Sequence, residues 1–133
     1  SPMDPHRRKP QDEIKELNNP DIGFTAGPVE EQNKWAATIM GPPNTPYEGG
    51  IFFLEINIPD NYPMESPTVV FRTRVYHCNI NSKGDIRSNI LHGNWNPEMR
   101  ISDILSEIRE MMITPNIELS LVPNIAAEYL EDR

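Results

Sequence analysis

The residues best suited to chemistry in this sequence are His77 and Cys78, which are neighbours in an irregular stretch, residues 75–100. An imidazole beside a thiol could form a nucleophile with its base, or supply two ligands of a metal site. Adjacent side chains of an extended chain point to opposite faces, which keeps these two out of hydrogen-bond reach. A zinc site needs about four ligands, and the sequence holds one cysteine and three histidines. The pattern therefore favours a buried thiol and a structural histidine, and we expect no metal and no cofactor.

Periodic apolar segments lie on both sides of this stretch and must position it. The pattern predicts a short helix over 10–17, strands over 24–29, 34–40, 51–58 and 68–74, a helix from Ile101 that Pro115 ends, and the opening of another helix over 123–130. In the first strand we expect Gly27-Pro28 to interrupt the pairing. The order predicts an α+β domain: an N-terminal helix, a four-stranded antiparallel meander, a central helix and the start of a C-terminal helix.

Composition and charge exclude several classes of partner. The formal net charge of −8 makes nucleic acid an unsuitable partner, and the run Arg7-Arg8-Lys9 is more typical of a solvated tail. We therefore expect residues 1–9 to form a flexible N-terminal tail, and residues 10–133 to form one domain. No apolar stretch approaches bilayer length, so we expect no membrane partner. One cysteine excludes an internal disulfide and suits a reducing compartment, the nucleus or the cytoplasm.

A set of longer motifs follows the predicted strands and the irregular stretch. They are Gly41-Pro42, Pro46-Tyr47-Glu48-Gly49-Gly50, Phe52-Phe53, Tyr62-Pro63, Pro67, Tyr76-His77-x-Asn79, Gly84-x-Ile86, Ile90-Leu91, Trp95-x-Pro97 and Leu121-Val122-Pro123. Together they resemble the signature of ubiquitin-conjugating enzymes over essentially the whole chain from about Pro10. The resemblance implies the ubiquitin-conjugating-enzyme fold, here in a domain that is short at its C-terminus.

The resemblance also implies a lost nucleophile. The family carries ubiquitin as a thioester on the cysteine of Gly-x-Ile-Cys-Leu-Asp-Ile-Leu. The matching run, residues 84–91, has the same length and holds Arg87 at the cysteine, Ser88 at the leucine and Asn89 at the aspartate. A guanidinium does not deprotonate in proteins, so Arg87 cannot form the thioester.

Other positions of the centre depart with it. His77-Cys78-Asn79 matches the family's His-Pro-Asn motif, where the asparagine is implicated in stabilising an oxyanion. With no thioester formed, we expect structural roles for Asn79 and His77. Leu119 matches the acidic residue that assists the incoming lysine. We therefore expect no catalytic residue, and degenerate positions at Arg87, Asn79, His77, Asn89 and Leu119. A relocated nucleophile at Cys78 stays a minor alternative.

The same resemblance implies where partners bind. Met64 and Asn96-Pro97-Glu98 match the loops that contact ubiquitin ligases, and Thr25 matches a sheet position where some relatives bind a second ubiquitin non-covalently. The chain is thus similar to the ubiquitin-conjugating enzyme variants, which lack the cysteine and act as scaffolds, and among these to the plant photomorphogenesis-repressor variant. Implied partners are an active conjugating enzyme, ubiquitin or a ubiquitin-like protein, and a ligase complex. The alternative is a ubiquitin-conjugating transferase whose nucleophile is replaced in this chain.

Overall fold

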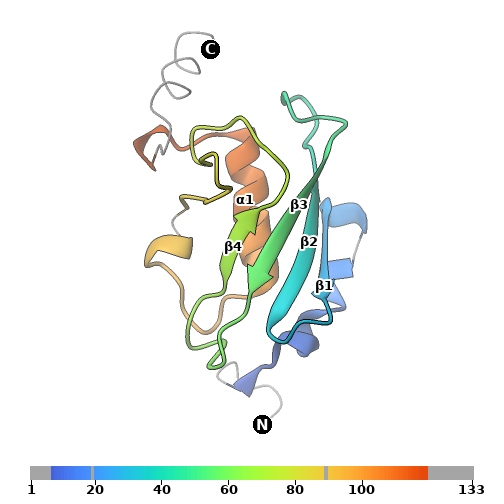
Figure 1. The fold of residues 1–133 in the computed structure, drawn as a ribbon, viewed down its shortest axis with the longest axis vertical. Helices are drawn as coiled ribbons and strands as arrows, with labels where there is room; N and C mark the ends of the chain where they lie inside the picture. The colour runs from blue at the N-terminus through green and yellow to red at the C-terminus, as the bar shows by residue number, and fades with distance from the viewer. Residues whose placement is uncertain (1–6, 19, 89, 120–133) are drawn as a thin grey trace.

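The computed structural model describes residues 7–18, 20–88 and 90–119 (Figure 1). The helix expected over 123–130 and Asn89 lie outside the described residues, as does the side chain of Leu119. Among the described residues, no helix is both long and apolar enough to cross a membrane.

Four strands form an antiparallel meander in the order β1-β2-β3-β4, which confirms the predicted sheet. They are β1 Phe24–Pro28, β2 Lys34–Met40, β3 Ile51–Asn57 and β4 Thr68–Phe71. In β2 the side chains of Trp35, Ala37 and Ile39 are buried and alternate with more exposed ones. This alternation gives the sheet one face toward the core and one toward solvent.

The predicted interruption of the first strand is wrong. Gly27 pairs with Ala36 and Pro28 pairs with Trp35, so β1 continues through both residues. The reason is position: β1 is the outermost strand of the sheet, and an edge strand accepts a proline because one row of its N–H groups needs no ladder partner.

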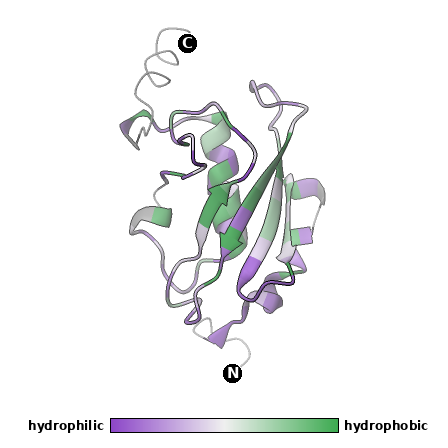
Figure 2. Ribbon diagram, in the orientation of Figure 1, coloured by the Kyte–Doolittle hydropathy of each residue, from purple (hydrophilic) through white to green (hydrophobic). Residues whose placement is uncertain are grey.

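The helix α1, Ile101–Ile113, covers the inner face of the sheet (Figure 1). Its apolar stripe is buried and consists of Ile101, Ile104, Leu105, Ile108, Met111 and Met112. Hydrophobic residues gather along α1, β3 and β4 in Figure 2. The helix ends at Ile113 because Thr114 is extended (φ −129°, ψ 95°), the conformation that the following Pro115 favours.

The N-terminal segment is helical but tighter than expected. The helix predicted over 10–17 is two 3-10 helices, η2 Pro10–Glu13 and η3 Glu16–Asn18. Backbone bonds such as Leu17 N–H to the Ile14 carbonyl (3.1 Å) span three residues. A segment this short does not nucleate an α-helix by itself, and here burial of Glu13 and Leu17 holds it in place.

Arg8 departs from the solvated tail expected for residues 7–9. Its side chain is buried, with Nε donating to Glu13 Oε2 at 3.0 Å and Nη2 donating to the carbonyl of Met99. Glu13 also accepts from the hydroxyl of Tyr62 at 2.5 Å and from the N–H of Ile101 at 2.8 Å. A carboxylate without water requires a counter-ion and several donors. Arg8 supplies the counter-ion, and Tyr62 and Ile101 supply the further donors. The cluster joins the N-terminal segment to the start of α1.

Candidate functional site

The segment that carries the expected nucleophile position begins at Gly84. A Cβ on Gly84 would lie 2.0 Å from the carbonyl oxygen of Phe71, and its φ is +88°, so only glycine suits this position. The close approach allows Phe71 N–H to donate to the Gly84 carbonyl at 2.9 Å. Gly84 therefore fixes the chain against β4 just before the residues of interest.

From there the chain runs extended, with buried and exposed side chains alternating. Ile86 and Ser88 are buried, whereas Arg87 between them is exposed. The N–H of Arg87 donates to the carbonyl of Asn79 at 2.9 Å. The structure thus puts the expected nucleophile position on the surface, directly beside the loop that holds His77 and Asn79.

His77 is buried, and both of its ring nitrogens have partners. Nε2 lies 2.7 Å from the carbonyl oxygen of Met111 in α1, and Nδ1 accepts from the N–H of Asn79 at 2.9 Å. A carbonyl only accepts and an N–H only donates, so the ring is neutral with its proton on Nε2. Burial lowers the pKa of His77, which keeps the ring neutral. The imidazole links the loop to the end of the helix.

Asn79 is fully buried, and its amide bonds the segment that follows α1. Nδ2 donates to the carbonyl of Asn116 at 2.6 Å, and Oδ1 accepts from the N–H of the same residue at 2.9 Å. The Cys78 thiol also donates to Oδ1, at 3.5 Å. The amide is therefore engaged on its donor and its acceptor side within the protein.

Cys78 is 2 % exposed. Burial raises the pKa of its thiol, so the reactive thiolate is disfavoured near neutral pH. The nearby phenol of Tyr47 is no base either, because burial raises its pKa to about 12; its hydroxyl donates to the Tyr76 carbonyl at 2.6 Å. His77 and Cys78 use their side chains for separate contacts.

Comparison with known proteins settles the family. The model of the family "Ubiquitin-conjugating enzyme" matches residues 9–133. The chain belongs to the ubiquitin-conjugating enzyme family. It is also similar to the solved E2 domain of a ubiquitin conjugating enzyme from Toxoplasma gondii, at 33% identity and a TM-score of 0.83, covering 92% of this chain and 85% of that one. The expected fold is confirmed.

A pocket of about 200 Å³ opens beside Arg87 in this ubiquitin-conjugating domain. Arg87 and Ser88 line it on the loop side, and Glu107, Glu110, Met111, Thr114 and Asn116 line it on the side of α1 and the segment after it. The Ser88 hydroxyl is buried and accepts from Leu91 N–H at 3.2 Å. Ser88 therefore holds the turn and does not present a nucleophile. The sequence analysis missed Glu107 and Glu110, which lie three apart on one helix face.

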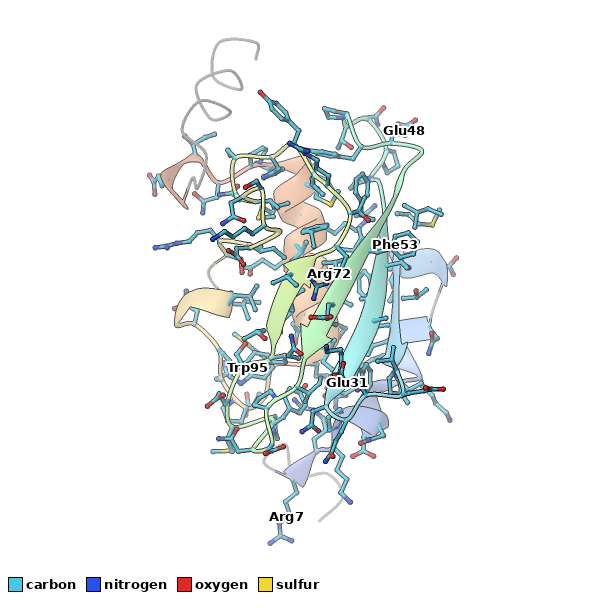
Figure 3. All side chains as sticks on the ribbon, in the orientation of Figure 1. Arg7, Glu31, Glu48, Phe53, Arg72 and Trp95 are labelled. Carbon is cyan, nitrogen blue, oxygen red and sulfur yellow. The ribbon has the colours of Figure 1, made fainter. Side chains whose placement is uncertain are left out.

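The two loops that match ligase-binding positions lie together. Trp95 Nε1 donates to the carbonyl of Pro63 at 2.8 Å, and the rings of Trp95 and Tyr62 are 5.8 Å apart. Met64 follows directly and is 53% exposed. Trp95 (labelled in Figure 3) therefore connects the Met64 loop to residues 96–98, which directly follow Trp95 in the chain.

Residues 96–98 are held by hydrogen bonds of their own. The carbonyl of Pro97 accepts from Nη1 of the buried Arg8 at 3.1 Å, and Asn96 Oδ1 accepts from the N–H of Glu98 at 2.9 Å. Asn96 and Glu98 are exposed. The buried cluster at the N-terminal end therefore also positions this surface.

Thr25 lies on the outer face of the sheet. Its hydroxyl bonds the hydroxyl of Thr38 at 2.7 Å, and Thr38 in turn pairs with Phe53 of β3. Phe53, which is labelled in Figure 3, lies in the same strand as Ile51, and Ile51 pairs with Met40. The exposed fractions are 55% for Phe53, 58% for Met40 and 55% for Ile51. The sequence analysis missed this apolar row, although all three residues are at outward-facing positions of their strands.

Within residues 7–18, 20–88 and 90–119, no three His, Cys, Asp or Glu side chains group as a metal site would require.

Proposed function

We propose that this domain is catalytically inactive and regulates ubiquitin conjugation non-covalently, as a scaffold. One observation carries the proposal: the nucleophile position holds an exposed arginine, Arg87, while the sequence's one cysteine, Cys78, is buried. Thioester formation requires a thiolate that can reach the adenylated terminus of ubiquitin. Neither residue meets that requirement.

The partners we propose are an active conjugating enzyme, ubiquitin or a ubiquitin-like protein, and a ligase complex, in the nucleus or the cytoplasm. Support comes from two surfaces. Met64 stands exposed on a loop that Trp95 holds, with Asn96, Pro97 and Glu98 beside it. Thr25 lies next to an exposed apolar row on the sheet. Flexible apolar side chains such as Met64 fit into hydrophobic grooves.

A thioester assay tests the loss of catalysis. The chain is incubated with activating enzyme, ubiquitin and ATP and analysed on non-reducing gels, and the assay is repeated with a panel of ubiquitin-like proteins. We expect no adduct that a thiol reductant removes. A reducible adduct that disappears in Cys78→Ala would overturn the proposal and establish Cys78 as the nucleophile.

A chain-formation assay tests the scaffold role. Adding the domain to reactions that contain an active conjugating enzyme and a ligase is expected to change the rate or the linkage of ubiquitin chains. Met64→Ala and Thr25→Arg address the two surfaces separately, and Arg74→Gln, an exposed residue of neither surface, is the matched control. A rate unchanged across a panel of active enzymes contradicts the scaffold role.

One observation favours a second candidate, an active ubiquitin-conjugating transferase with a replaced nucleophile. The loop of His77 and Asn79 is fully hydrogen-bonded next to Arg87, so the frame of an active centre is present. If Arg87→Cys alone restores both charging and transfer to lysine, this candidate gains.

A further inference from the structure

We propose that a basic pocket at the end of β4 binds a phosphorylated serine or threonine side chain of a partner protein. The pocket has a volume of about 260 Å³ and lies between residues 71–75, which begin with the last residue of β4, and the turn 81–84. Arg87 is not among its lining residues. The inference goes beyond the proposed function, because it holds whether or not the domain is active.

The lining of this pocket is positively charged. Arg72 (labelled in Figure 3), Arg74 and Lys83 contribute three cations, and no Asp or Glu is among the lining residues. Arg72 uses one nitrogen, Nη2, for an ion pair with Glu55 at 2.6 Å. Arg74 and Lys83 are exposed, and within the part of the chain that the structure describes neither side chain has an ion pair or a hydrogen bond. In a chain of net charge −8, such a group of cations favours a site for an anion.

Two hydroxyl groups add neutral donors to the cations. Thr73 Oγ1 accepts from the N–H of Phe53 at 2.7 Å, which leaves the hydroxyl hydrogen of Thr73 available to a ligand. Ser82 is exposed, and its hydroxyl has no partner among the described residues. A phosphate monoester carries nearly two negative charges at neutral pH and three acceptor oxygens. It can therefore engage several of these donors at once, whereas a carboxylate, with one charge and two oxygens, would leave some of them unused.

The turn that carries Ser82 and Lys83 is fixed by its own hydrogen bonds. Asn81 Oδ1 accepts from the N–H groups of Lys83 at 2.9 Å and of Asp85 at 3.0 Å. The N–H of Gly84 donates to the carbonyl of Asn81 at 3.0 Å. Asn81 Nδ2 donates to the carboxylate of Asp85 at 3.0 Å, and Asp85 does not line the pocket. A turn that is already ordered lowers the entropy cost of binding.

The surroundings of the pocket favour one isolated phosphate. Glu55 and Asp85 lie beside the cations, and the net charge of −8 repels a ligand whose negative charge extends beyond the pocket. A nucleic acid strand and an anionic membrane each present many charges side by side. A phosphorylated side chain in a segment without acidic neighbours presents a single charged group. The ligand that fits is therefore a phosphoserine or phosphothreonine in a neutral or basic sequence.

A titration with synthetic peptides tests the inference. The isotope-labelled domain is titrated with a short neutral peptide that carries a central phosphoserine, and with the same peptide carrying serine or glutamate instead, while chemical shifts are followed by NMR. We expect shifts at Arg74, Ser82 and Lys83. We also expect the phosphopeptide to bind roughly tenfold more tightly than the serine peptide and about threefold more tightly than the glutamate peptide. Equal affinities of the three peptides overturn the inference.

Other anions separate the possible sources of the phosphate. Inorganic phosphate is expected to shift the same resonances but to bind more weakly than the phosphopeptide, because it lacks the contacts of the flanking backbone. Vesicles of phosphatidylcholine and phosphatidylserine, and a single-stranded oligonucleotide, are expected not to bind at physiological salt. If inorganic phosphate binds as tightly as the phosphopeptide, or if vesicles or the oligonucleotide bind more tightly than it, a protein segment is not the ligand.

Variants locate the binding site. Arg74→Gln and Lys83→Gln are each expected to weaken phosphopeptide binding roughly three- to tenfold and to leave the serine peptide unchanged. Lys15→Gln, which removes an exposed lysine outside the pocket, is the matched control and should bind as wild type does. Because all three side chains are exposed, the variants should keep the stability of wild type in urea. Wild-type phosphopeptide affinity in the double variant of Arg74 and Lys83 would overturn the inference.

The outcome is independent of the tests of the proposed function. In chain-formation reactions without phosphorylated components, Arg74→Gln is expected to behave as wild type does, so it remains a control there. A reducible ubiquitin adduct, or a failure of the scaffold assay, would overturn the proposed function and leave phosphopeptide binding in place. Conversely, a pocket that does not discriminate among the three peptides overturns the phosphate site while the thioester assay still reports an inactive domain.

Discussion

Two neighbouring segments of the site differ in how deeply they are built into the protein. In the 77–79 loop, His77 and Asn79 are buried and every polar side-chain group named above has a partner. The backbone N–H of Arg87 donates to the carbonyl of Asn79 in that loop, but the Arg87 side chain is exposed to solvent. It makes no ion pair among the described residues.

This difference in burial and pairing determines which of these residues the stability of the fold depends on. Removing a buried, paired group leaves its partners unsatisfied, and that penalty falls on folding. An exposed side chain without such partners has little effect on stability. The cysteine position of this family can therefore hold an arginine without damage to the fold, whereas His77 and Asn79 hold the loop whether or not a reaction takes place there.

Asn79→Ala should give the largest loss. It removes both partners of Asn116 (2.6 and 2.9 Å) and leaves that residue's carbonyl and N–H unpaired in a partly buried place. We expect the free energy of unfolding to fall by about 3 kcal/mol, measured by urea denaturation. Arg87→Ala is the matched control, with a change of at most about 0.5 kcal/mol. Equal losses of unfolding free energy in the two variants would mean that the fold depends no more on Asn79 than on Arg87.

Cys78 should resist thiol reagents. With 2 % of its surface exposed and burial raising the pKa of its thiol, we expect modification by a disulfide reagent about 100-fold slower in the folded protein than in urea. Stopped-flow absorbance measures both rates. A rate near that of the unfolded chain would mean that Cys78 is accessible, and would favour the relocated nucleophile.

Stability should fall below neutral pH through His77. Burial lowers the pKa of the folded-state ring below its unfolded value of 6.5, so the unfolded chain binds the proton more tightly. The contribution is fully present above pH 6.5 and is lost as the pH falls toward the folded-state pKa, with a slope of at most about 1.4 kcal/mol per pH unit. Urea melts at pH 7.5 and 5.5 measure it.

The control for that dependence is His77→Gln, which removes the titrating group but keeps an amide that reaches similar partners. We expect it to be less stable at pH 7.5 and to lose less stability between pH 7.5 and 5.5. If wild type and variant lose equal amounts, other groups carry the acid sensitivity and the burial of a neutral His77 is not the cause.

Arg87→Cys should have the smallest effect. We expect the free energy of unfolding to change by at most about 0.5 kcal/mol, since the side chain is exposed. We also expect little or no transfer of ubiquitin to lysine, because the resemblance predicts that Asn89 and Leu119 stand where active relatives have acidic residues. Denaturation and a single-turnover lysine-discharge assay measure the two expectations, and efficient discharge would contradict the second.

The sheet and the helix were predictable because their patterns are local. The strand predicted over 34–40 has the bounds of β2, since its alternation is complete from end to end. The strand predicted to reach Arg74 ends at Phe71 instead. There the N–H groups of Arg72 and Thr73 both donate to the carbonyl of Phe53 in the neighbouring strand β3, at 2.7 and 3.3 Å. Such a bond between residues about twenty positions apart leaves no trace in the local pattern.

Part of the candidate site was also predictable. The resemblance of the sequence motifs to the family identified Arg87, His77 and Asn79, and the structure brings these three together. The two glutamates that line the pocket, Glu107 and Glu110, were missed because the sequence pattern of their helix face is typical of ordinary solvent-exposed charge. Only the packing of α1 beside residues 87–88 gives that face a counterpart.

The sequence by itself determined that Arg87 stands where the resemblance places the family's cysteine and that Arg87 cannot form a thioester, because side-chain chemistry is a property of residue type and a guanidinium forms no thioester in any fold. Only the tertiary structure decided that Cys78 is buried, that Arg8 is buried against Glu13 rather than solvated, and that Arg87 lines a pocket together with two glutamates. Burial and charge placement arise from contacts between residues far apart in the chain, and such contacts exist only after folding.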